Sequence, residues 1–234
     1  MNQGFHIAID GPVAAGKSTV SRKLAEKLGF LLIDTGAMYR AVTLAAHRQG
    51  VDLTDETALV DLISRLKLEV RLPLASEQDD RQSTVLLDGE DVSWDIRKGA
   101  VNRDVATVAA LPRVREALVP IQQQIAQGQN VVMEGRDITY IVLPNAQIKI
   151  YLDANFEVRV DRYLEARSTQ KKEVTIEEAK TWLEERDDTD KNRAASPLKI
   201  VPGVWVLDSS KLSIDQVVEL ITAKAKSLMS GENK

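Results

Sequence analysis

The sequence contains no cysteine among its 234 residues. Disulfides, thiolate zinc sites and cysteine nucleophiles are therefore excluded. Aromatic residues are also scarce, at 4%, so aliphatic side chains must fill most of the core. Hydrophobic residues make up 44% of the chain, which is enough for a folded core and argues against disorder. The length fits one domain, or a core domain with inserted lobes.

An excess of basic residues is missing as well. The formal net charge is −4 and the sequence pI is about 5.4. Because nucleic-acid binding needs a basic surface, we expect no nucleic-acid partner. Long apolar runs are absent, and residues 1–5 show no basic segment followed by an apolar one. We therefore expect a cytoplasmic protein without a membrane partner, and we expect it to be a monomer.

Short apolar runs indicate a buried parallel sheet, because strands covered on both faces are apolar throughout. We expect five core strands at residues 5–10, 30–34, 131–133, 148–152 and 204–207. Residues 17–28 form an amphipathic helix that Gly29 ends, so the first two strands enclose a βαβ unit. Further helices are predicted at about residues 155–170, 175–188 and 213–228. The fold class is therefore α/β.

The pattern changes between about residues 53 and 99. A helical stretch at residues 54–66 is followed by weakly alternating segments at 68–72 and 84–87, with a turn at Asp88-Gly89. This pattern predicts a small lobe with a β-meander, inserted into the α/β core. Two helices follow at about residues 102–110 and 113–126, separated by Pro112.

The segment after the first strand matches the phosphate-binding pattern G-x-x-x-x-G-K-[ST] in full. Such a loop points backbone N–H groups at phosphate oxygens, and the following helix adds its positive dipole end. Lys17 would reach the β- and γ-phosphates of ATP, and the Ser18 hydroxyl would coordinate Mg²⁺. The predicted ATP-binding residues are Gly11, Pro12, Val13, Ala14, Ala15, Gly16, Lys17, Ser18 and Thr19.

The loop alone predicts nucleotide binding but no particular reaction. A switch GTPase needs D-x-x-G and N-K-x-D motifs, and the chain contains neither. A small-molecule kinase is the natural interpretation. A phosphorylated acceptor then requires a second anion site, for which arginine is suited because its planar guanidinium matches phosphate. Candidates follow predicted strand ends in Asp34–Arg40 and Glu134–Asp137. Asp34 and Glu134 would either orient Mg²⁺ through water or hold nearby arginines.

A third candidate is the charged run Arg186–Arg193, which contains no apolar residue. It is either a solvated loop or part of a lid that closes over ATP. In order and spacing, this run, the phosphate loop and three further motifs resemble the bacterial cytidylate kinase family across essentially the whole chain. The motifs are Gly11–Thr19, Asp34–Arg40, Pro112–Arg115, Glu134–Ile138 and Glu185–Arg193.

The resemblance implies a P-loop kinase core with a five-stranded parallel sheet flanked by helices, an NMP-binding lobe and a lid. The implied core covers about residues 1–36, 111–154 and 194–234, the lobe about 37–110 and the lid about 155–193. It also implies phosphorylation of CMP and dCMP by ATP and Mg²⁺. Lys17, Arg136 and Arg186 would be catalytic. The implied CMP-binding residues are Thr35, Tyr39, Arg40, Arg115, Arg136, Asp137, Arg186, Asp190 and Arg193.

Within that set, Arg40, Arg136 and Arg186 would hold the CMP phosphate, and Asp190 the sugar hydroxyl. Arg115, Asp137 and Arg193 would lie at the cytosine. The chemistry of one pair agrees independently, because a carboxylate and a guanidinium complement the amino donor and ring acceptors of cytosine.

The sequence departs from the family pattern at three places. Ala106 stands where the family usually has a serine that touches the base. Thr139-Tyr140 replaces Gly-Thr, and Thr189 and Lys191 replace lid arginines. A broader UMP/CMP kinase, another acceptor on the same scaffold, and a non-catalytic nucleotide-binding protein therefore stay open as alternatives.

Overall fold

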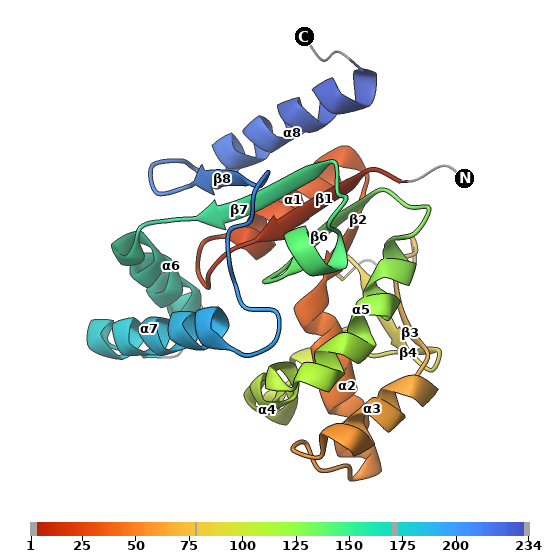
Figure 1. Cartoon of the computed structure of the whole chain (residues 1–234). Helices are drawn as coiled ribbons and strands as arrows, with labels where there is room; N and C mark the ends of the chain where they lie inside the picture. Colours follow the sequence, from red (N-terminus) through yellow and green to blue (C-terminus); the bar gives the residue numbers. More distant parts are fainter. Residues whose placement is uncertain (1–3, 78, 170–172, 232–234) are drawn as a thin grey trace.

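A computed structural model describes residues 4–77, 79–169 and 173–231. Figure 1 shows a central parallel sheet with helices on both faces. Its five strands have the order β2-β6-β1-β7-β8, so the predicted five-stranded parallel sheet is confirmed. The strands are β1 (His6–Asp10), β2 (Leu31–Asp34), β6 (Val131–Gly135), β7 (Ile148–Asp153) and β8 (Trp205–Asp208).

Alternate residues of the strands supply two separate hydrophobic clusters. On one face Ile7 and Ile9 pack with α1 (Lys17–Leu28) and α8 (Ile214–Ser230). On the other face Ala8 packs with α2 (Thr35–Gln49) and α5 (Pro112–Ala126). The strands β1, β2 and β6 are buried on both faces, which explains their apolar runs, whereas the edge strand β8 exposes Val206.

Local sequence signals define several helix ends. The α1 helix ends at Gly29, which adopts a left-handed conformation (φ 67°). Capping boxes begin α7 (Ile176–Asn192) at Thr175 and α8 at Ser213. The box at Thr175 confirms the start that the sequence predicts.

The inserted lobe contains the predicted β-meander, in a three-stranded antiparallel sheet of order β3-β4-β5. Its elements are α3 (Glu56–Arg65), β3 (Leu68–Arg71), β4 (Thr84–Leu87), β5 (Glu90–Asp91), the 3₁₀ helix η1 (Asp95–Arg97) and α4 (Gly99–Ala110). Buried residues of α2 and of these elements share one hydrophobic cluster, which fixes the elements beside the end of β2.

The α6 helix (Phe156–Thr169) and α7 form a pair at the carboxyl ends of β7 and β1 (Figure 1). Val160, Ala179 and Leu183 form the buried contact between them, and Val13 and Ala14 of the phosphate loop pack against it. The interpretation of residues 186–193 as a solvated loop is wrong: α7 continues to Asn192. Gln170, at the end of the predicted helix 155–170, lies outside the described residues.

A π-helical segment, η2 (Ile138–Val142), follows β6 and covers the end of β1. The carboxylate of Asp10 fixes this segment by accepting hydrogen bonds from the backbone N–H groups of Ile138 (2.9 Å) and Thr139 (2.8 Å).

Among the described residues, no helix has both the length and the apolar character needed to cross a membrane.

Candidate active site

The phosphate loop joins β1 to α1 at the carboxyl edge of the sheet. Ala14 (φ 61°) and Gly16 (φ 94°) both have left-handed backbone conformations. Successive residues of mixed handedness turn backbone N–H groups toward one concave surface, which is the geometry of an anion cradle. Gly16 directly precedes α1, so the helix dipole adds to the positive potential there. The predicted ATP-binding segment therefore has the shape that phosphate requires.

Lys17 lies folded inside this cradle. Its ammonium donates a hydrogen bond to the carbonyl of Pro12 (2.7 Å), and the residue is only 7% exposed. Burial, followed by repulsion from Arg136, lowers the pKa of Lys17 to about 7 against the opposing effect of Glu134. A bound phosphate would supply negative charge that stabilises the Lys17 ammonium.

Glu134 and Ser18 provide oxygen atoms next to the cradle. Strand pairing sets Glu134 beside both Ile9 and Asp34, and the Ser18 hydroxyl donates to its carboxylate (3.1 Å). Burial and the charge of Asp34 raise the pKa of Glu134 to about 7. Mg²⁺ in kinases is held by one or two protein oxygens, substrate phosphates and waters, so a hydroxyl and a carboxylate fit this ion. Within the described ranges, no cluster of three or more acidic or histidine side chains forms an all-protein metal site.

The second anion site begins at Asp34, which caps α2. Its Oδ2 atom lies 2.9 Å from Nη2 of Arg40 and 3.7 Å from Nη2 of Arg97. The interpretation that Asp34 holds an arginine therefore agrees with the geometry. Arg97 lies on η1 of the lobe and was missed by sequence reasoning, because only the packing of η1 on α2 brings it to Asp34.

Asp190 of α7 lies close to three further arginines of the predicted CMP-binding set. Its carboxylate, 2% exposed, lies 2.8 Å from Arg136, 3.5 Å from Arg186 and 3.9 Å from Arg193. Burial opposes ionisation, but these arginines outweigh it and hold the pKa of Asp190 below its usual value. Arg136, which follows β6, and residues at the end of α7 therefore meet at one buried acid.

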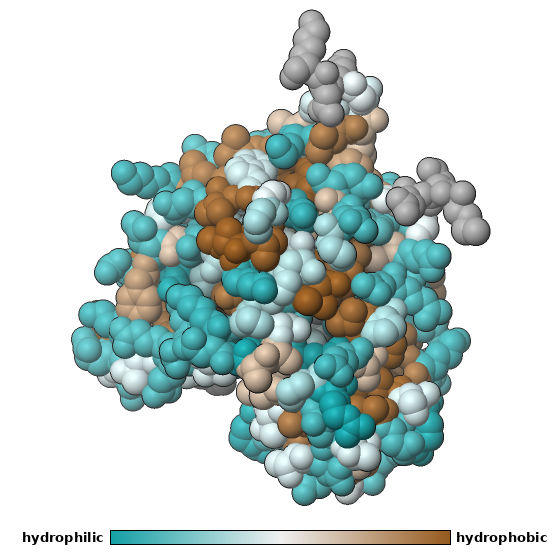
Figure 2. Space-filling model, in the orientation of Figure 1, coloured by the Kyte–Doolittle hydropathy of each residue, from teal (hydrophilic) through white to brown (hydrophobic). Residues whose placement is uncertain are grey.

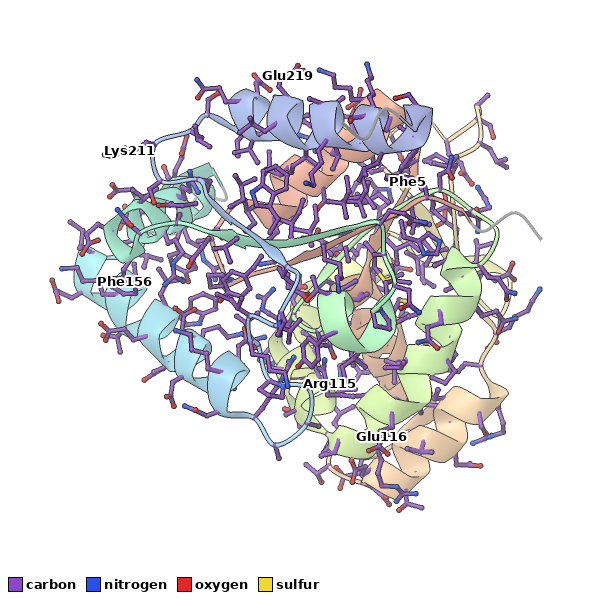
Figure 3. All side chains as sticks on the ribbon, turned by 45° about the horizontal axis from the view of Figure 1, so that its top comes forward. Phe5, Arg115, Glu116, Phe156, Lys211 and Glu219 are labelled. Atoms are coloured by element: carbon purple, nitrogen blue, oxygen red, sulfur yellow. The ribbon has the colours of Figure 1, made fainter. Side chains whose placement is uncertain are left out.

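Arg115 and Asp137 form a buried ion pair, with Nη2 and Oδ2 2.6 Å apart. The guanidinium also donates to the carbonyl of Ala109 (3.0 Å) and lies 5.2 Å from the ring centre of Tyr39. Figure 3 shows Arg115 on the side of α5 that faces the rest of the molecule, whereas Glu116 points outward. The structure thus brings the predicted base-binding pair together.

Gly135 and Thr35 connect these groups at the strand ends. The Thr35 hydroxyl donates to the carbonyl of Glu134 (2.8 Å), and a Cβ atom on Gly135 would lie 2.7 Å from the Thr35 hydroxyl oxygen. A side chain at residue 135 would therefore displace the Thr35 hydroxyl from its bond to Glu134.

Two arginines of α6 bind the phosphate loop and were not identified from the sequence. Arg159 donates to the carbonyl of Val13 (3.2 Å) and forms a two-point ion pair with buried Asp187 of α7. Arg162 donates to the carbonyl of Ala15 (3.1 Å) and to Ser209 after β8. The sequence signal that could have identified them is the spacing of three residues between two arginines in a helix that directly follows a strand.

The positions that depart from the family pattern have different surroundings. Ala106 is exposed on α4, as is its neighbour Thr107. Thr189 and Lys191 are exposed on α7, and Thr189 donates to the carbonyl of Glu185 (2.8 Å) within that helix. Figure 2 shows that the surface over α6 and α7 is mostly hydrophilic.

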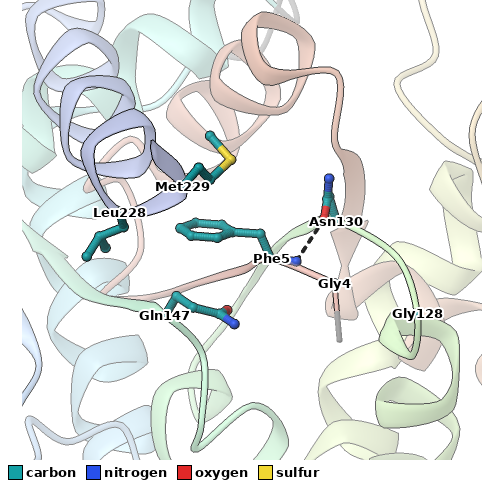
Figure 4. A pocket seen from close by; sticks show the side chains of 7 residues that line it. All are labelled: Gly4, Phe5, Gly128, Asn130, Gln147, Leu228 and Met229. Carbon is teal, nitrogen blue, oxygen red and sulfur yellow. Dashed lines mark hydrogen bonds between the residues drawn. The ribbon is translucent and has the colours of Figure 1, made fainter. Parts of the chain in front are cut away.

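A separate hollow of about 830 Å³ lies at the opposite, amino-terminal ends of the strands. Figure 4 shows Phe5, Leu228 and Met229 beside the amides of Asn130 and Gln147. Asn130 accepts the Phe5 N–H (2.8 Å) and Gln147 the His6 N–H (2.7 Å), so both amides anchor the start of β1. The hollow is thus remote from the phosphate loop.

Comparison with known proteins agrees with this geometry. A sequence model of the family described as cytidylate kinase matches residues 7–227. The chain belongs to the cytidylate kinase family. Cytidylate kinases of Caldanaerobacter subterraneus subsp. tengcongensis and Pelotomaculum thermopropionicum are 43% and 46% identical to it. The alignments cover 99% of both chains for the first relative, and 96% of this chain and 97% of the relative for the second.

Membership of the cytidylate kinase family makes the protein an enzyme of the phosphotransferase class, a nucleoside monophosphate kinase. Two solved structures share the fold at 14% identity. They are an uncharacterized protein from Eubacterium ventriosum (TM-score 0.53, 95% of this chain and 99% of the other) and a gluconokinase from Sinorhizobium meliloti (TM-score 0.51, 99% and 97%).

Proposed function

We propose that this protein transfers the γ-phosphoryl group of ATP to CMP and dCMP, forming CDP and dCDP. The observation that carries the proposal is the buried pair of Arg115 and Asp137 beside the second anion site. Relatives over 40% identical along nearly the whole chain are cytidylate kinases, which supports the same acceptor.

In this proposal the acceptor phosphate binds among Arg40, Arg136 and Arg186. These arginines are already gathered by Asp34 and Asp190, so the acceptor meets a preformed cationic site. An oxygen of the acceptor phosphate attacks the γ-phosphorus, the bond to the β,γ-bridging oxygen breaks, and ADP leaves. No general base is needed, because a phosphate is already anionic at neutral pH. The contribution of the residues is alignment and charge neutralisation.

The pair of Arg115 and Asp137 would read the base. The carboxylate would accept a hydrogen bond from the exocyclic amino group of cytosine, and the guanidinium would donate hydrogen bonds to the ring acceptors. Uracil has a carbonyl in place of the amine. That carbonyl and the carboxylate of Asp137 are both hydrogen-bond acceptors, so no hydrogen bond could form between them. Because Ala106 offers no hydroxyl, discrimination against UMP rests on this pair in the proposal.

At the donor site, Lys17 would leave the carbonyl of Pro12 and bind the β- and γ-phosphates of ATP. Ser18 and Glu134 would hold Mg²⁺, which when bound neutralises phosphate charge. We call α6 and α7 the lid helices, and we propose that Arg159 and Arg162 couple them to the phosphate loop. A lid fixed over the loop excludes water and so limits ATP hydrolysis.

ADP release from ATP and Mg²⁺, coupled to an absorbance change, tests the proposal with CMP, dCMP, UMP, AMP, GMP and dTMP each as acceptor. We expect turnover with CMP and dCMP alone. Equal turnover with UMP would keep the reaction but make the protein a broader pyrimidine kinase. Equal rates with and without acceptors would refute the kinase proposal and leave a nucleotide-binding protein.

The boundaries of the core, the NMP-binding lobe and the lid also belong to the proposal. The antiparallel sheet β3-β4-β5 and the α6–α7 pair support them as units of closure. The cytoplasmic location, the monomeric state and the lack of a nucleic-acid partner stay predictions from the sequence.

A further inference from the structure

Tyr140 makes contacts outside its own segment. It belongs to η2, whose first N–H groups are held by Asp10 of β1, so its backbone is fixed to the core. Its hydroxyl donates a hydrogen bond to the carbonyl of Pro197, 57 residues further along the chain. The ammonium of Lys199 lies 4.6 Å from the centre of its ring. Tyr140 therefore connects the core to the segment that follows α7.

That segment, residues 193–204, has no helix or strand and leads from α7 to β8. Ser196 within it adopts a left-handed backbone (φ 51°). Two hydrogen bonds tie it back to the active site: Arg193 donates to the carbonyl of Ser196 (2.7 Å from Nε), and the Leu198 N–H donates to the carbonyl of Asp190 (2.7 Å). Pro197 lies between these two ties.

We propose that Tyr140 is a positioning residue that fixes this segment so that Arg193 and Asp190 face the acceptor nucleotide. This inference rests on the proposed function for the identity of the acceptor. Without the hydroxyl, residues 196–198 lose their direct bond to the core. Arg193, which is oriented by the Ser196 carbonyl, then samples positions away from Asp137 and Arg115. Tyr140 thus acts through Arg193 rather than by touching the reacting atoms.

The test compares Tyr140→Phe with the wild type. Phenylalanine keeps the ring that Lys199 covers and removes only the hydrogen-bond donor. We expect the KM for CMP to rise about 3- to 10-fold, as for the loss of one hydrogen bond. The KM for ATP and kcat should stay within about twofold. Tyr163→Phe is the matched control, because that ring stacks on Trp182 of the lid helices at 4.8 Å and should leave every parameter unchanged.

A double-mutant cycle separates positioning from a general structural effect. If Tyr140 acts through Arg193, Tyr140→Phe should change the KM for CMP less than about twofold in an Arg193→Met background. Full additivity of the two changes would overturn the inference.

Hydrogen exchange of the nucleotide-free protein, followed by mass spectrometry, tests the tie without using activity. Tyr140→Phe should accelerate exchange in residues 194–200, which include the Leu198 amide, by at least about fivefold while leaving β1 and β6 unchanged. Unchanged exchange would refute the tie itself. Faster exchange with an unchanged KM for CMP would refute its positioning role. If the wild type shows no acceptor-dependent turnover, the proposed function fails and the acceptor claim with it, while the exchange result still decides the tie.

Discussion

Oδ2 of Asp190 lies 2.8 Å from Nε of Arg136, although the two residues are 54 positions apart in the sequence. The same carboxylate lies near Arg186 and Arg193 and is nearly inaccessible to solvent. One acid therefore keeps three cations of the proposed acceptor site close together.

The first prediction removes that charge. Asp190→Asn removes the buried carboxylate that three guanidinium groups share, and breaking a buried pair in this way costs about 3–5 kcal/mol. We expect the free energy of unfolding, measured in urea, to fall by an amount of this order, and the KM for CMP to rise at least about tenfold. Asp188→Asn, on the exposed side of the same helix, is the control and should behave as the wild type. An unchanged KM for CMP would show that Asp190 does not organise the acceptor site.

The second prediction concerns Lys17. Lys17→Met should lower kcat at least about 100-fold, because a positioned cation at the transferring phosphoryl group is lost. The fold should survive with an equal or higher melting temperature, since the buried ammonium is costly in the free protein. Lys23→Met, on the solvent side of α1 where Lys23 pairs with Asp215, is the matched control. Normal turnover by Lys17→Met would refute the proposed donor site.

Features encoded in short segments were predictable. The phosphate loop, the apolar strands and the capping box at Thr175 each depend on neighbouring residues, so their physical reasons can be read from a few positions. The parallel sheet followed because strands covered on both faces are apolar throughout. The candidate residues after the phosphate loop came from the family resemblance of compact motifs, and their roles stay predictions.

Pairings between distant segments were not predictable. Arg97 reaches Asp34 only because the lobe packs on α2, and Arg159 reaches the phosphate loop only because α6 lies across it. The burial of Asp187 and Asp190 was also hidden, since a run with no apolar residue resembles a solvated loop. Their arginine partners satisfy both charges, which makes burial possible.

The third prediction is a proton uptake on ATP binding. The pKa of Lys17 is about 7 in the free protein, and bound phosphates would raise it by stabilising the ammonium. At a pH above 7, binding should therefore draw a proton from solution, and the affinity for ATP should fall as the pH rises. The pKa of Glu134 is also raised to about 7, and in the absence of Mg²⁺ the phosphates would raise it further, so ATP alone adds uptake of the same sign.

Titration calorimetry with ATP in the absence of Mg²⁺, in buffers with different ionisation heats, measures this uptake. Lys17→Met removes the lysine contribution, so this variant should take up fewer protons than the wild type. Proton release on binding, or affinity that increases with pH, would contradict the prediction.

The fourth prediction concerns the support of η2. The fully buried Asp10 carboxylate accepts two backbone N–H groups, and Asp10→Asn would turn one acceptor into an amide donor facing them. Leaving a buried backbone donor unpaired costs about 1–3 kcal/mol, so the free energy of unfolding should fall by that amount. Urea unfolding measures it, with Asp188→Asn again as a surface control. Equal stability would mean that η2 does not depend on this carboxylate.

The last prediction separates donor from acceptor binding. Arg159 and Asp187 join the lid helices through Oδ2 and Nη2 2.6 Å apart, and Arg159 also holds the Val13 carbonyl of the phosphate loop. Asp187→Asn weakens this link while Asp190 and its arginines stay in place. We expect the KM for ATP to rise about 5- to 20-fold, in line with the loss of one charge-assisted bond, while the KM for CMP changes little. Because a loosened lid admits water, ADP release without acceptor should also increase. Glu184→Gln, exposed on α7, controls for the loss of one negative charge. A larger effect on CMP than on ATP would mean that the pair serves the acceptor site instead.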